Sequence, residues 1–435
     1  MSNSLSLGNA LNWLDSHINI EANSHADFPP PSLVKIRGAL EMIGEPQKSY
    51  PAIHVTGTNG KGSTCRMITA LLMAHGLRVG TYTSPHLMTI NERIMVDLEP
   101  ISDAGLIDEL ATLKILEEHS GKTLSWFELV TAAAFSYFDT VGIDVAVIEV
   151  GMGGAWDATN VIDGAVAVVT NISRDHVEIL GPELTDIARE KSGIIKPTSS
   201  VVLGVDQADL LDIFLSKPST AVSILGQDLL LRSNTQAIGG RVLGIRTKHA
   251  AYDQIFVPLF GPHQGQNAAL AIGAVEEFFG RALDLDVTKA AFERVTSPGR
   301  MEVVSREPLV VLDAAHNPAG MQSVKTGVLS DFSSISNWHL VVSMLRGRES
   351  EEMFRAIVSD KIISVSVAKS RSLRAMEVDE ICAGAKKAGL GCQVFETVSE
   401  ALEAEVSACG DGEGVLVCGS IYTVAEAREQ MLKRK

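Results

Sequence analysis

The sequence predicts an α/β protein, with a large and mostly parallel sheet followed by a smaller Rossmann-like α/β unit. Apolar runs of strand length alternate with amphipathic helical patterns along most of the chain, which is typical of parallel sheets with right-handed crossovers. The chain has 435 residues, and a length of this order indicates two or three domains of about 100–200 residues each. Two consecutive α/β units account for both observations.

The first unit is organised around residues 52–76. An apolar run, 52–55, is followed by the glycine-rich loop GTNGKGST and then by a helical pattern that stops at Gly76. A strand, a glycine loop and a helix in this order bind phosphate, because backbone amides, the helix N-terminus and a lysine converge on its oxygens. The sequence therefore predicts a P-loop-type sheet.

The loop is shorter than a standard P-loop, since Val55 stands where the motif G-x-x-x-x-G-K has its first glycine. The alternative is an ordinary glycine-rich turn with an exposed lysine, but the strand–helix context favours phosphate binding. The hydroxyl of Ser63 or Thr64 is expected to reach a phosphate-bound Mg²⁺. Candidate phosphate-binding residues are Asn59, Gly60, Lys61, Gly62, Ser63 and Thr64.

Charge and cysteine usage restrict the compartment and the partners. The formal net charge of −16 argues against nucleic acid or an anionic membrane as a partner, because both require basic surface. The five cysteines form no C-x-x-C pair, which favours free thiols in a reducing cytoplasm over disulfides or zinc. The sequence shows no signal-peptide pattern and no apolar run of membrane-spanning length. We expect a cytoplasmic protein.

Further elements of the first unit follow from the same patterns. Ser125 and Glu128 have the spacing of a capping box, which marks the start of a helix. The proline-rich segment 21–32 excludes helix, and is expected to be either a connector or the lip of a substrate site. Helices are expected over residues 7–18, 33–43, 102–119 and 125–138, and strands over 78–83, 144–150 and 165–170.

Polar residues follow three of these strands. Ser84 comes after the first, Glu149 is near the end of the second, and His176 follows the third. Because the carboxyl ends of parallel strands meet at one edge, these residues are predicted to form one site with the phosphate loop. Glu149 could instead be a solvated strand end and His176 a structural histidine. A carboxylate in so apolar a run is costly, however, unless it is paired or bound to a metal.

The chain changes character at residues 219–260, where short β runs separated by glycines indicate a small antiparallel excursion. A helix is expected over 266–279, and the Ser-Pro-Gly sequence at 297–299 is interpreted as a hinge. The strands of the second unit are expected over 309–312, 340–342, 362–367, 394–395 and 415–418. This predicts domains over residues 1–296 and 297–435.

Eight motifs give the chain a family resemblance. GTNGKGS, TSPHL, FELVTAAAF, EVGMGGAWDATNVI, NISRDHVEILG, HQGQNAALA, SPGRME and DAAHNPAG occur in this order. The set resembles the folylpolyglutamate synthase/dihydrofolate synthase family, a branch of the Mur ligases, from the N-terminal loop to the last strand. The resemblance implies a Mur ligase-like ATPase domain over 1–296 and a C-terminal glutamate ligase domain over 297–435.

The resemblance also implies a reaction. ATP would phosphorylate a pterin-linked carboxylate, and the amino group of L-glutamate would then displace phosphate from the acyl phosphate to form an amide. The expected substrates are dihydropteroate or folate, L-glutamate and ATP, with both synthase activities on one monomeric chain. The alternatives are a monofunctional folylpolyglutamate synthase, another Mur-type ligase that acts on a cell-wall precursor, and a nucleotide-binding switch without ligase activity.

Site residues carried over from the family fall into three groups. ATP would be contacted by the phosphate loop and by Asn267, Arg300, Asp313 and His316. Two Mg²⁺ ions, with K⁺ as a further candidate, would be held by Ser84, Glu149, His176 and Lys191, and the catalytic set would be Lys61, His176 and Lys191. The pterin substrate would contact Ser125, Trp126, Phe127, Glu128, Trp156, Asp157 and Ala158.

Several of these residues have structural alternatives. Trp126 and Phe127 are by themselves more typical of a core, and His316 could hold a turn. Lys191 could form a surface salt bridge. In the family the matching lysine is carbamylated, and a carbamate attracts a dication that an ammonium repels.

Three segments depart from the family pattern. The residues 28–32 are proline-rich where the family has a leucine–glycine–leucine loop, and 348–350 read Arg-Glu-Ser in place of a D-K-D motif. Met88 stands where a basic residue follows TSPHL. These departures bear on the preferred pteroate substrate and not on the ATP-binding motifs.

Overall fold

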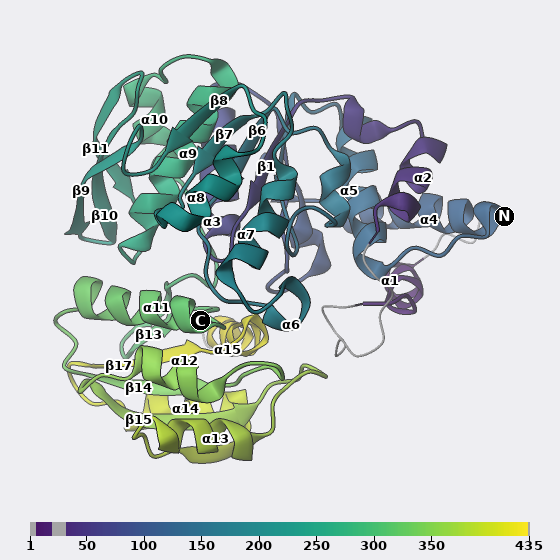
Figure 1. Cartoon of the computed structure of the whole chain (residues 1–435). Coiled ribbons are helices and arrows are strands. Elements are labelled where there is room, and N and C mark those ends of the chain that lie inside the picture. Colours follow the sequence, from purple (N-terminus) through teal and green to yellow (C-terminus); the bar gives the residue numbers. More distant parts are fainter. Residues whose placement is uncertain (1–5, 20–31, 434–435) are drawn as a thin grey trace.

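The computed structural model describes residues 6–19 and 32–433, and these form three sheets (Figure 1). The large sheet has eight strands in the order β4-β3-β2-β5-β1-β6-β7-β8. A three-stranded sheet, β11-β10-β9, follows it in sequence, and the third sheet has six strands in the order β12-β13-β17-β14-β15-β16. The expected extended path of residues 21–32 lies almost entirely outside the described residues.

The large sheet is parallel from β2 to β8 and antiparallel where β3 and β4 extend it. Its central strand, β1, is buried at every residue, because helices cover both faces of such a sheet. The strands are β1 Ala52–Thr56, β2 Val79–Tyr82, β3 Ile94–Val96, β4 Glu99–Pro100, β5 Val145–Glu149, β6 Val166–Val169, β7 Ser200–Leu203 and β8 Ala221–Ile224.

Two groups of helices pack on the faces of this sheet. On one face, in the core that contains Ile53 and Val55, α3 (Lys61–Ala74) packs on β1 and α9 (His263–Phe279) packs on β6 and β7, while α10 (Leu285–Phe292) packs on α3. The opposite face is covered by α1 Leu7–Asp15, α2 Val34–Met42, α4 Asp103–Ser120, α5 Trp126–Val141, α7 Leu184–Lys191 and α8 Ala208–Leu215. Successive strand residues thus enter different cores, as the period of two requires.

The excursion predicted over 219–260 is confirmed in part. Its strands β9 (Leu230–Ala237), β10 (Gly240–Arg246) and β11 (Ala251–Val257) pair antiparallel. The first run assigned to it instead forms β8, which pairs in parallel with β7 of the large sheet. That part of the prediction is wrong, because α8 supplies the crossover that a parallel pair needs.

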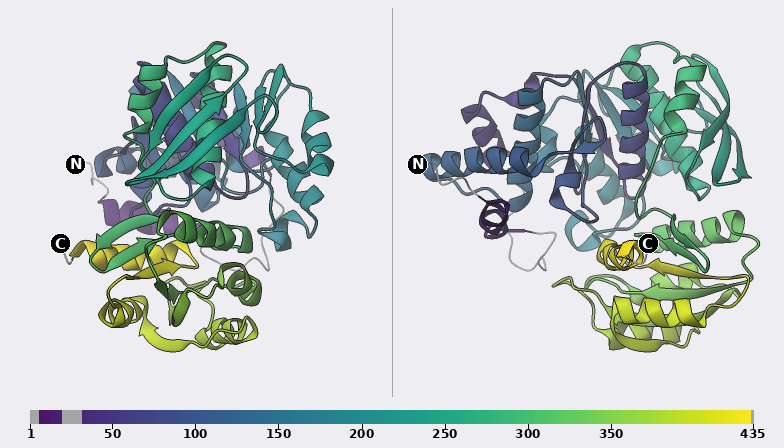
Figure 2. Two further views of the ribbon diagram at one scale, coloured as in Figure 1. Left: turned by 90° about the vertical axis from the view of Figure 1, so that its left-hand side faces the viewer. Right: turned by 180° about the vertical axis from the view of Figure 1, so that it is seen from behind.

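The six-stranded sheet forms a three-layer unit that lies below the first unit in Figure 1 and is seen from two further sides in Figure 2. Only β12 runs antiparallel, at one edge. The strands are β12 Glu302–Arg306, β13 Leu309–Leu312, β14 Asn337–Val342, β15 Ile362–Lys369, β16 Gln393–Thr397 and β17 Glu413–Cys418. One face is covered by α11 Pro318–Asp331, α12 Ser350–Ile357 and α13 Val378–Lys387, the other by α14 Val398–Ala408 and α15 Ile421–Lys433.

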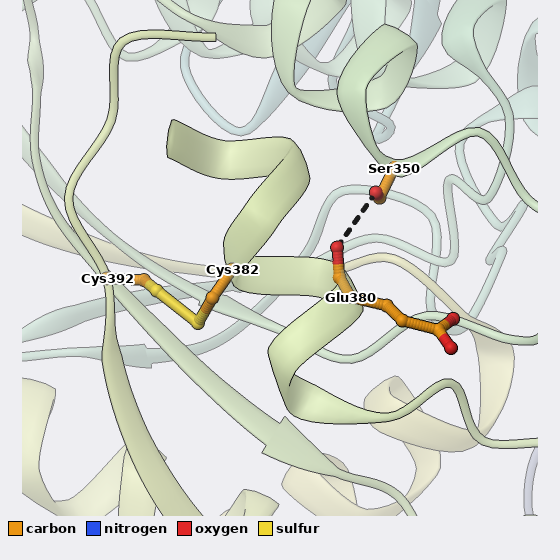
Figure 3. Close-up of a disulfide and its surroundings, with 4 residues drawn as sticks. All are labelled: Ser350, Glu380, Cys382 and Cys392. Atoms are coloured by element: carbon orange, nitrogen blue, oxygen red, sulfur yellow. Dashed lines mark hydrogen bonds between the residues drawn. A yellow bond between two sulfur atoms is a disulfide. The ribbon is translucent and has the colours of Figure 1, made fainter. Parts of the chain in front are cut away.

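One pair of cysteines contradicts the prediction of free thiols. Cys382 on α13 and Cys392 just before β16 form a disulfide, with their Cα atoms 6.0 Å apart (Figure 3). The chain turns back after α13, and this reversal brings together two thiols that are ten positions apart. The number and spacing of cysteines in the sequence do not predict that two of them lie close together in the fold. Cys65, Cys409 and Cys418 are free.

Figure 3 also shows the link between α12 and α13, where the Ser350 hydroxyl donates to the Glu380 carbonyl oxygen at 3.2 Å.

In the part of the chain that the structure describes, no helix has both the length and the apolar character needed to span a bilayer.

Candidate active site

A cavity of about 400 Å³ lies between the two α/β units. The first unit lines it with the phosphate loop and with residues at the carboxyl ends of β2, β5 and β6, and the second unit with the loop after β13. The predicted residues that line it are Asn59, Gly60, Lys61, Gly62, Ser63, Ser84, Glu149, His176, Lys191, Asn267, Arg300, Asp313 and His316. The structure therefore brings together thirteen predicted residues from distant parts of the sequence.

Two residues that follow β6 hold the phosphate loop in place. The backbone carbonyl of Asn59 accepts hydrogen bonds from the Thr170 hydroxyl at 2.6 Å and from the Asn171 amide at 2.9 Å. Gly60 has a φ of +86° and a Cβ there would lie 2.5 Å from Asn267 Oδ1, so only glycine fits. Among the described residues no side chain caps α3, and its first amides are thus available to an anion.

Lys61 lies over this loop. Its Nζ donates to the carbonyl oxygens of Gly57 at 3.2 Å and Thr58 at 3.3 Å. Ser63 also lines the cavity, with its Oγ 2.9 Å from Ser297 Oγ in the predicted hinge. Thr64 is fully buried, does not line the cavity, and its hydroxyl has no hydrogen-bond partner among the described residues. Of the two hydroxyls proposed for Mg²⁺, Ser63 is the one that lines the cavity.

Glu149 and His176 provide a donor set suited to a metal ion. The buried Glu149 carboxylate accepts the Ser84 backbone N–H at 3.1 Å, and burial raises its pKa while the charge of Lys61 opposes this. Burial lowers the pKa of His176 to about 3, which leaves a neutral imidazole. Its Nδ1 is buried without a hydrogen-bond partner among the described residues. A carboxylate, a neutral imidazole and the Ser84 hydroxyl fit a hydrated hard cation.

Lys191 is buried beneath the same loop. Its Nζ donates to the Gly57 carbonyl oxygen at 2.8 Å. Burial, and then the positive charge of Lys61, lower the Lys191 pKa to about 7. A substantial fraction of this side chain is therefore the uncharged amine at neutral pH.

The second unit contributes an anchored aspartate and a histidine. The buried Asp313 carboxylate accepts backbone N–H groups of Met301 at 2.9 Å and Ala315 at 2.8 Å. His316 Nε2 lies 3.3 Å from Asp175 of the first unit. His316 also contacts its own turn, as the structural alternative predicted, because its Nδ1 lies 2.9 Å from the Ala314 carbonyl oxygen.

The residues predicted to contact the pterin do not line this cavity. Ser125 and Glu128 form the capping box of α5. Trp126 is buried, donates to Asp15 at 3.0 Å, and has the Arg93 guanidinium 4.7 Å from its ring centre.

Phe127 packs against a residue that lines the cavity. A Cβ on Gly151, which lines the cavity, would lie 2.5 Å from the Phe127 ring. This ring therefore packs behind the loop 151–154.

The other predicted pterin residues support the same loop. The buried Asp157 carboxylate accepts the Met152 N–H at 2.9 Å and caps the turn that begins at Ala158, which is itself buried. The backbone N–H of Trp156 donates to the Glu190 carboxylate at 3.1 Å. A contact of any of these residues with substrate stays a prediction.

Comparison with known proteins decides the family. Residues 55–275 match the Mur ligase middle domain, and residues 299–421 match the Mur ligase, glutamate ligase domain. The chain is 36% identical over 440 residues to the dihydrofolate synthase/folylpolyglutamate synthase of Mycobacterium tuberculosis, with 92% of this chain and 89% of that protein covered. The Bacillus subtilis protein of the same name is 32% identical over 419 residues, with 92% and 95% covered. The chain belongs to the folylpolyglutamate synthase/dihydrofolate synthase family.

Solved structures agree with this assignment. A Mycobacterium tuberculosis folylpolyglutamate synthase complexed with ADP has a TM-score of 0.90 and 35% identity, with 98% of each chain covered. Escherichia coli FolC in complex with DHPP and ADP has a TM-score of 0.84 and 26% identity, again with 98% of each covered. This family member is an ATP-dependent ligase with the two-domain Mur ligase fold.

Three residues that hold the two units of this ligase together were absent from the sequence-based prediction. Asp175 accepts a hydrogen bond from Asn317 Nδ2 at 2.9 Å and forms an ion pair with Arg348. Asn59 Nδ2 donates to Asn317 Oδ1 at 3.2 Å. Asp175 precedes His176 and Asn317 follows His316 in two of the family motifs, and these positions are the sequence feature that points to them as site residues. Arg348 lies in a segment that departs from the family pattern.

Proposed function

We propose that this ligase uses ATP to join L-glutamate to dihydropteroate and to the glutamate tail of tetrahydrofolate, as a bifunctional dihydrofolate synthase/folylpolyglutamate synthase. One observation carries the proposal. Phosphate-loop residues, a buried carboxylate with a neutral histidine, and polar residues of the glutamate ligase domain line a single cavity. The names of the relatives with this domain pair support the substrate class.

The chemistry requires alignment of anions more than a protein nucleophile. A carboxylate oxygen of the pterin substrate attacks the γ-phosphorus of ATP, the bond to the bridging oxygen breaks, and ADP leaves. The amino group of L-glutamate then attacks the acyl carbon, loses a proton and expels phosphate, which leaves an amide. Lys61, which lies on the loop, and the uncapped amides at the start of α3 would hold the phosphates in both steps.

Mg²⁺ fits the set formed by Ser84, Glu149 and His176, and when bound it would neutralise phosphate charge. Glu149 is a buried carboxylate, and a cation beside it would offset the cost of its burial. His176 is suited to the same role, because its neutral ring carries a lone pair.

The second domain would complete the nucleotide site. We place the boundary between residues 296 and 297, next to the hydroxyl contact between Ser63 and Ser297. Arg300, Asp313 and His316 line the cavity from the second domain. Movement at residues 297–299 would therefore open and close the site around ATP.

Lys191 is proposed to carry a carbamate. Its uncharged amine would attack CO₂, form an N–C bond and release one proton. Its pKa of about 7 supplies that amine at neutral pH. The product is an anion beneath the phosphate loop, where an ammonium would repel both Lys61 and a metal ion.

A phosphate-release assay with each substrate omitted in turn tests the function. Release should require ATP, L-glutamate and a pterin substrate, and both dihydropteroate and tetrahydrofolate should support it. Phosphate release with tetrahydrofolate but not with dihydropteroate as the pterin substrate would indicate a monofunctional folylpolyglutamate synthase. Release only with a nucleotide-sugar acid would indicate a cell-wall ligase, and ATP hydrolysis without amide formation would overturn the ligase assignment.

A further inference from the structure

A second group of metal-ligating side chains lies on the six-stranded sheet, at the edge opposite the cavity. His339 is near the start of β14, Glu413 begins β17, and Cys409 follows α14. One potential ligand atom from each of the three lies within 4.8 Å of those of the others. Because β13, β14 and β17 are parallel, this edge is remote from Asp313, which follows the carboxyl end of β13.

The ring of His339 is oriented by a buried carboxylate. Its Nδ1 lies 2.7 Å from Oε2 of Glu405, a buried residue of α14. Glu405 also accepts hydrogen bonds from Ser364 Oγ at 2.9 Å and Ser366 Oγ at 2.6 Å. This carboxylate therefore favours a proton on Nδ1 and directs Nε2 towards Glu413. Histidines that bind zinc have the same arrangement, with a carboxylate on the second ring nitrogen.

The Glu413 carboxylate is also held in place. Its Oε1 accepts the Asn337 side-chain amide at 2.9 Å, and its Oε2 accepts the Gly410 backbone N–H at 2.9 Å. Oε2 lies 3.1 Å from His339 Nε2. Nitrogen and oxygen ligands about 2.0–2.1 Å from a tetrahedral ion are roughly 3.3 Å apart. The observed separation is close to that value.

We propose that His339, Cys409 and Glu413 bind a divalent cation of the zinc class. On binding, the Cys409 thiol loses its proton to solvent and its sulfur closes on the ion by rotation of the side chain. Cys409 and Glu413 are only partly buried, which leaves a fourth position for water. The thiolate selects zinc or a similar borderline-soft ion over Mg²⁺. The bound ion would fasten the end of α14 to β14 and β17.

The same contacts have a metal-free interpretation, in which a protonated His339 is held between Glu405 and Glu413. The two interpretations differ over Cys409, which takes part only in the first. Cysteine spacing in the sequence disfavoured zinc, but the fold supplies the other two ligands from distant positions. Cys409 is therefore the residue to test.

Cobalt(II) is the probe, because a thiolate ligand gives it a near-ultraviolet charge-transfer absorption that oxygen and imidazole ligands do not. The full-length protein is treated with a chelator, reduced with a phosphine and titrated with Co²⁺. We expect the charge-transfer band to saturate at one ion per chain. Cobalt in the ATP cavity would not produce the band, because the described residues that line it include no cysteine.

Cys409→Ser should abolish the band, whereas Cys418→Ala and the double variant Cys382→Ala/Cys392→Ala should retain it. Glu405→Gln should weaken cobalt affinity about 10–100-fold, because it alters the group that orients His339. Zn²⁺ should raise the Tm of the wild type more than that of Cys409→Ser, in which only the metal-binding residues of the ATP cavity remain. Circular dichroism confirms folding of each variant, and Glu413→Gln provides a second ligand variant that should lose affinity.

Three results would overturn the proposal. One is the absence of a charge-transfer band at stoichiometric Co²⁺ in the wild type. Another is a band that persists in folded Cys409→Ser. The third is equal stabilisation of the wild type and Cys409→Ser by Zn²⁺. Either of the last two results would assign metal binding to other groups and leave His339 in the metal-free ion pair.

Discussion

Arg348, in the loop after β14, forms an ion pair with Asp175, the residue that precedes His176 in the first domain. The same carboxylate accepts from Asn317 and lies 3.3 Å from His316 Nε2. Burial alone would raise the pKa of Asp175, but the hydrogen bond from His316 and the charge of Arg348 help to hold it well below its usual value. One aspartate of the first domain thus joins three residues of the second.

Arg348→Ala should weaken this closed arrangement. We expect kcat/KM for ATP to fall roughly 30-fold, or about 2 kcal/mol, because truncation of a mostly buried charge pair leaves the partner unpaired. Steady-state kinetics measure the effect, and small-angle scattering reports on domain closure. Arg346→Ala is the matched control, since Arg346 forms an exposed pair with Glu377. Equal kinetics in the two variants would contradict a closing role for Arg348.

Lys61→Ala should reduce turnover by about 10²–10³ and leave the Tm close to that of the wild type. Its ammonium contacts only loop carbonyls in the described structure, so its role is expected in the phosphate complex. Lys48→Ala, which removes an exposed lysine paired with Glu45, should leave both quantities unchanged. A folded Lys61→Ala enzyme with normal turnover would show that the phosphate loop has been assigned incorrectly.

A carbamate on Lys191 should give a ¹³C NMR signal after exposure to ¹³CO₂. The amine reacts and the ammonium does not, and burial lowers the Lys191 pKa to about 7. The signal should therefore grow from roughly pH 6 to roughly pH 8. Lys191→Arg should lose the signal and the activity, because arginine remains protonated. A fully active Lys191→Arg enzyme would exclude the modification from the mechanism.

Trp126→Ala separates a structural from a substrate-binding role. Trp126 is buried, donates to Asp15, and lies under the Arg93 guanidinium. Loss of this ring should lower the free energy of unfolding by about 3–5 kcal/mol, as measured by urea denaturation. The KM for the pterin substrate should change little in the protein that remains folded. A large rise in KM with unchanged stability would support the pterin contact instead.

Much of the first domain and of the site follows from local patterns. Glu149 stands in a strand that is buried throughout, and the cost of a carboxylate in so apolar a run is itself a sign of a functional role. Lys61 is identified by its strand–loop–helix context in the same way. Parallel strands then determine that their carboxyl ends share an edge.

The remaining features depend on proximity between distant segments. The pairing of β8 with β7 depends on a crossover helix, and the Cys382–Cys392 bond on a chain reversal. Arg348 reaches Asp175 only because the two domains face each other. Ser125 and Glu128 show the limit of motif transfer, since their local capping pattern explains their positions without a substrate.

The transfer of oxygen from substrate to phosphate tests the ligase mechanism most directly. The enzyme is supplied with ATP, L-glutamate and dihydropteroate that carries ¹⁸O in its carboxylate, and both products are analysed by mass spectrometry. An acyl phosphate requires one ¹⁸O atom in the released phosphate and a pterin product that has gained one glutamyl residue and keeps the other ¹⁸O atom in its new amide. Unlabelled phosphate alongside the glutamylated product would contradict the proposed mechanism.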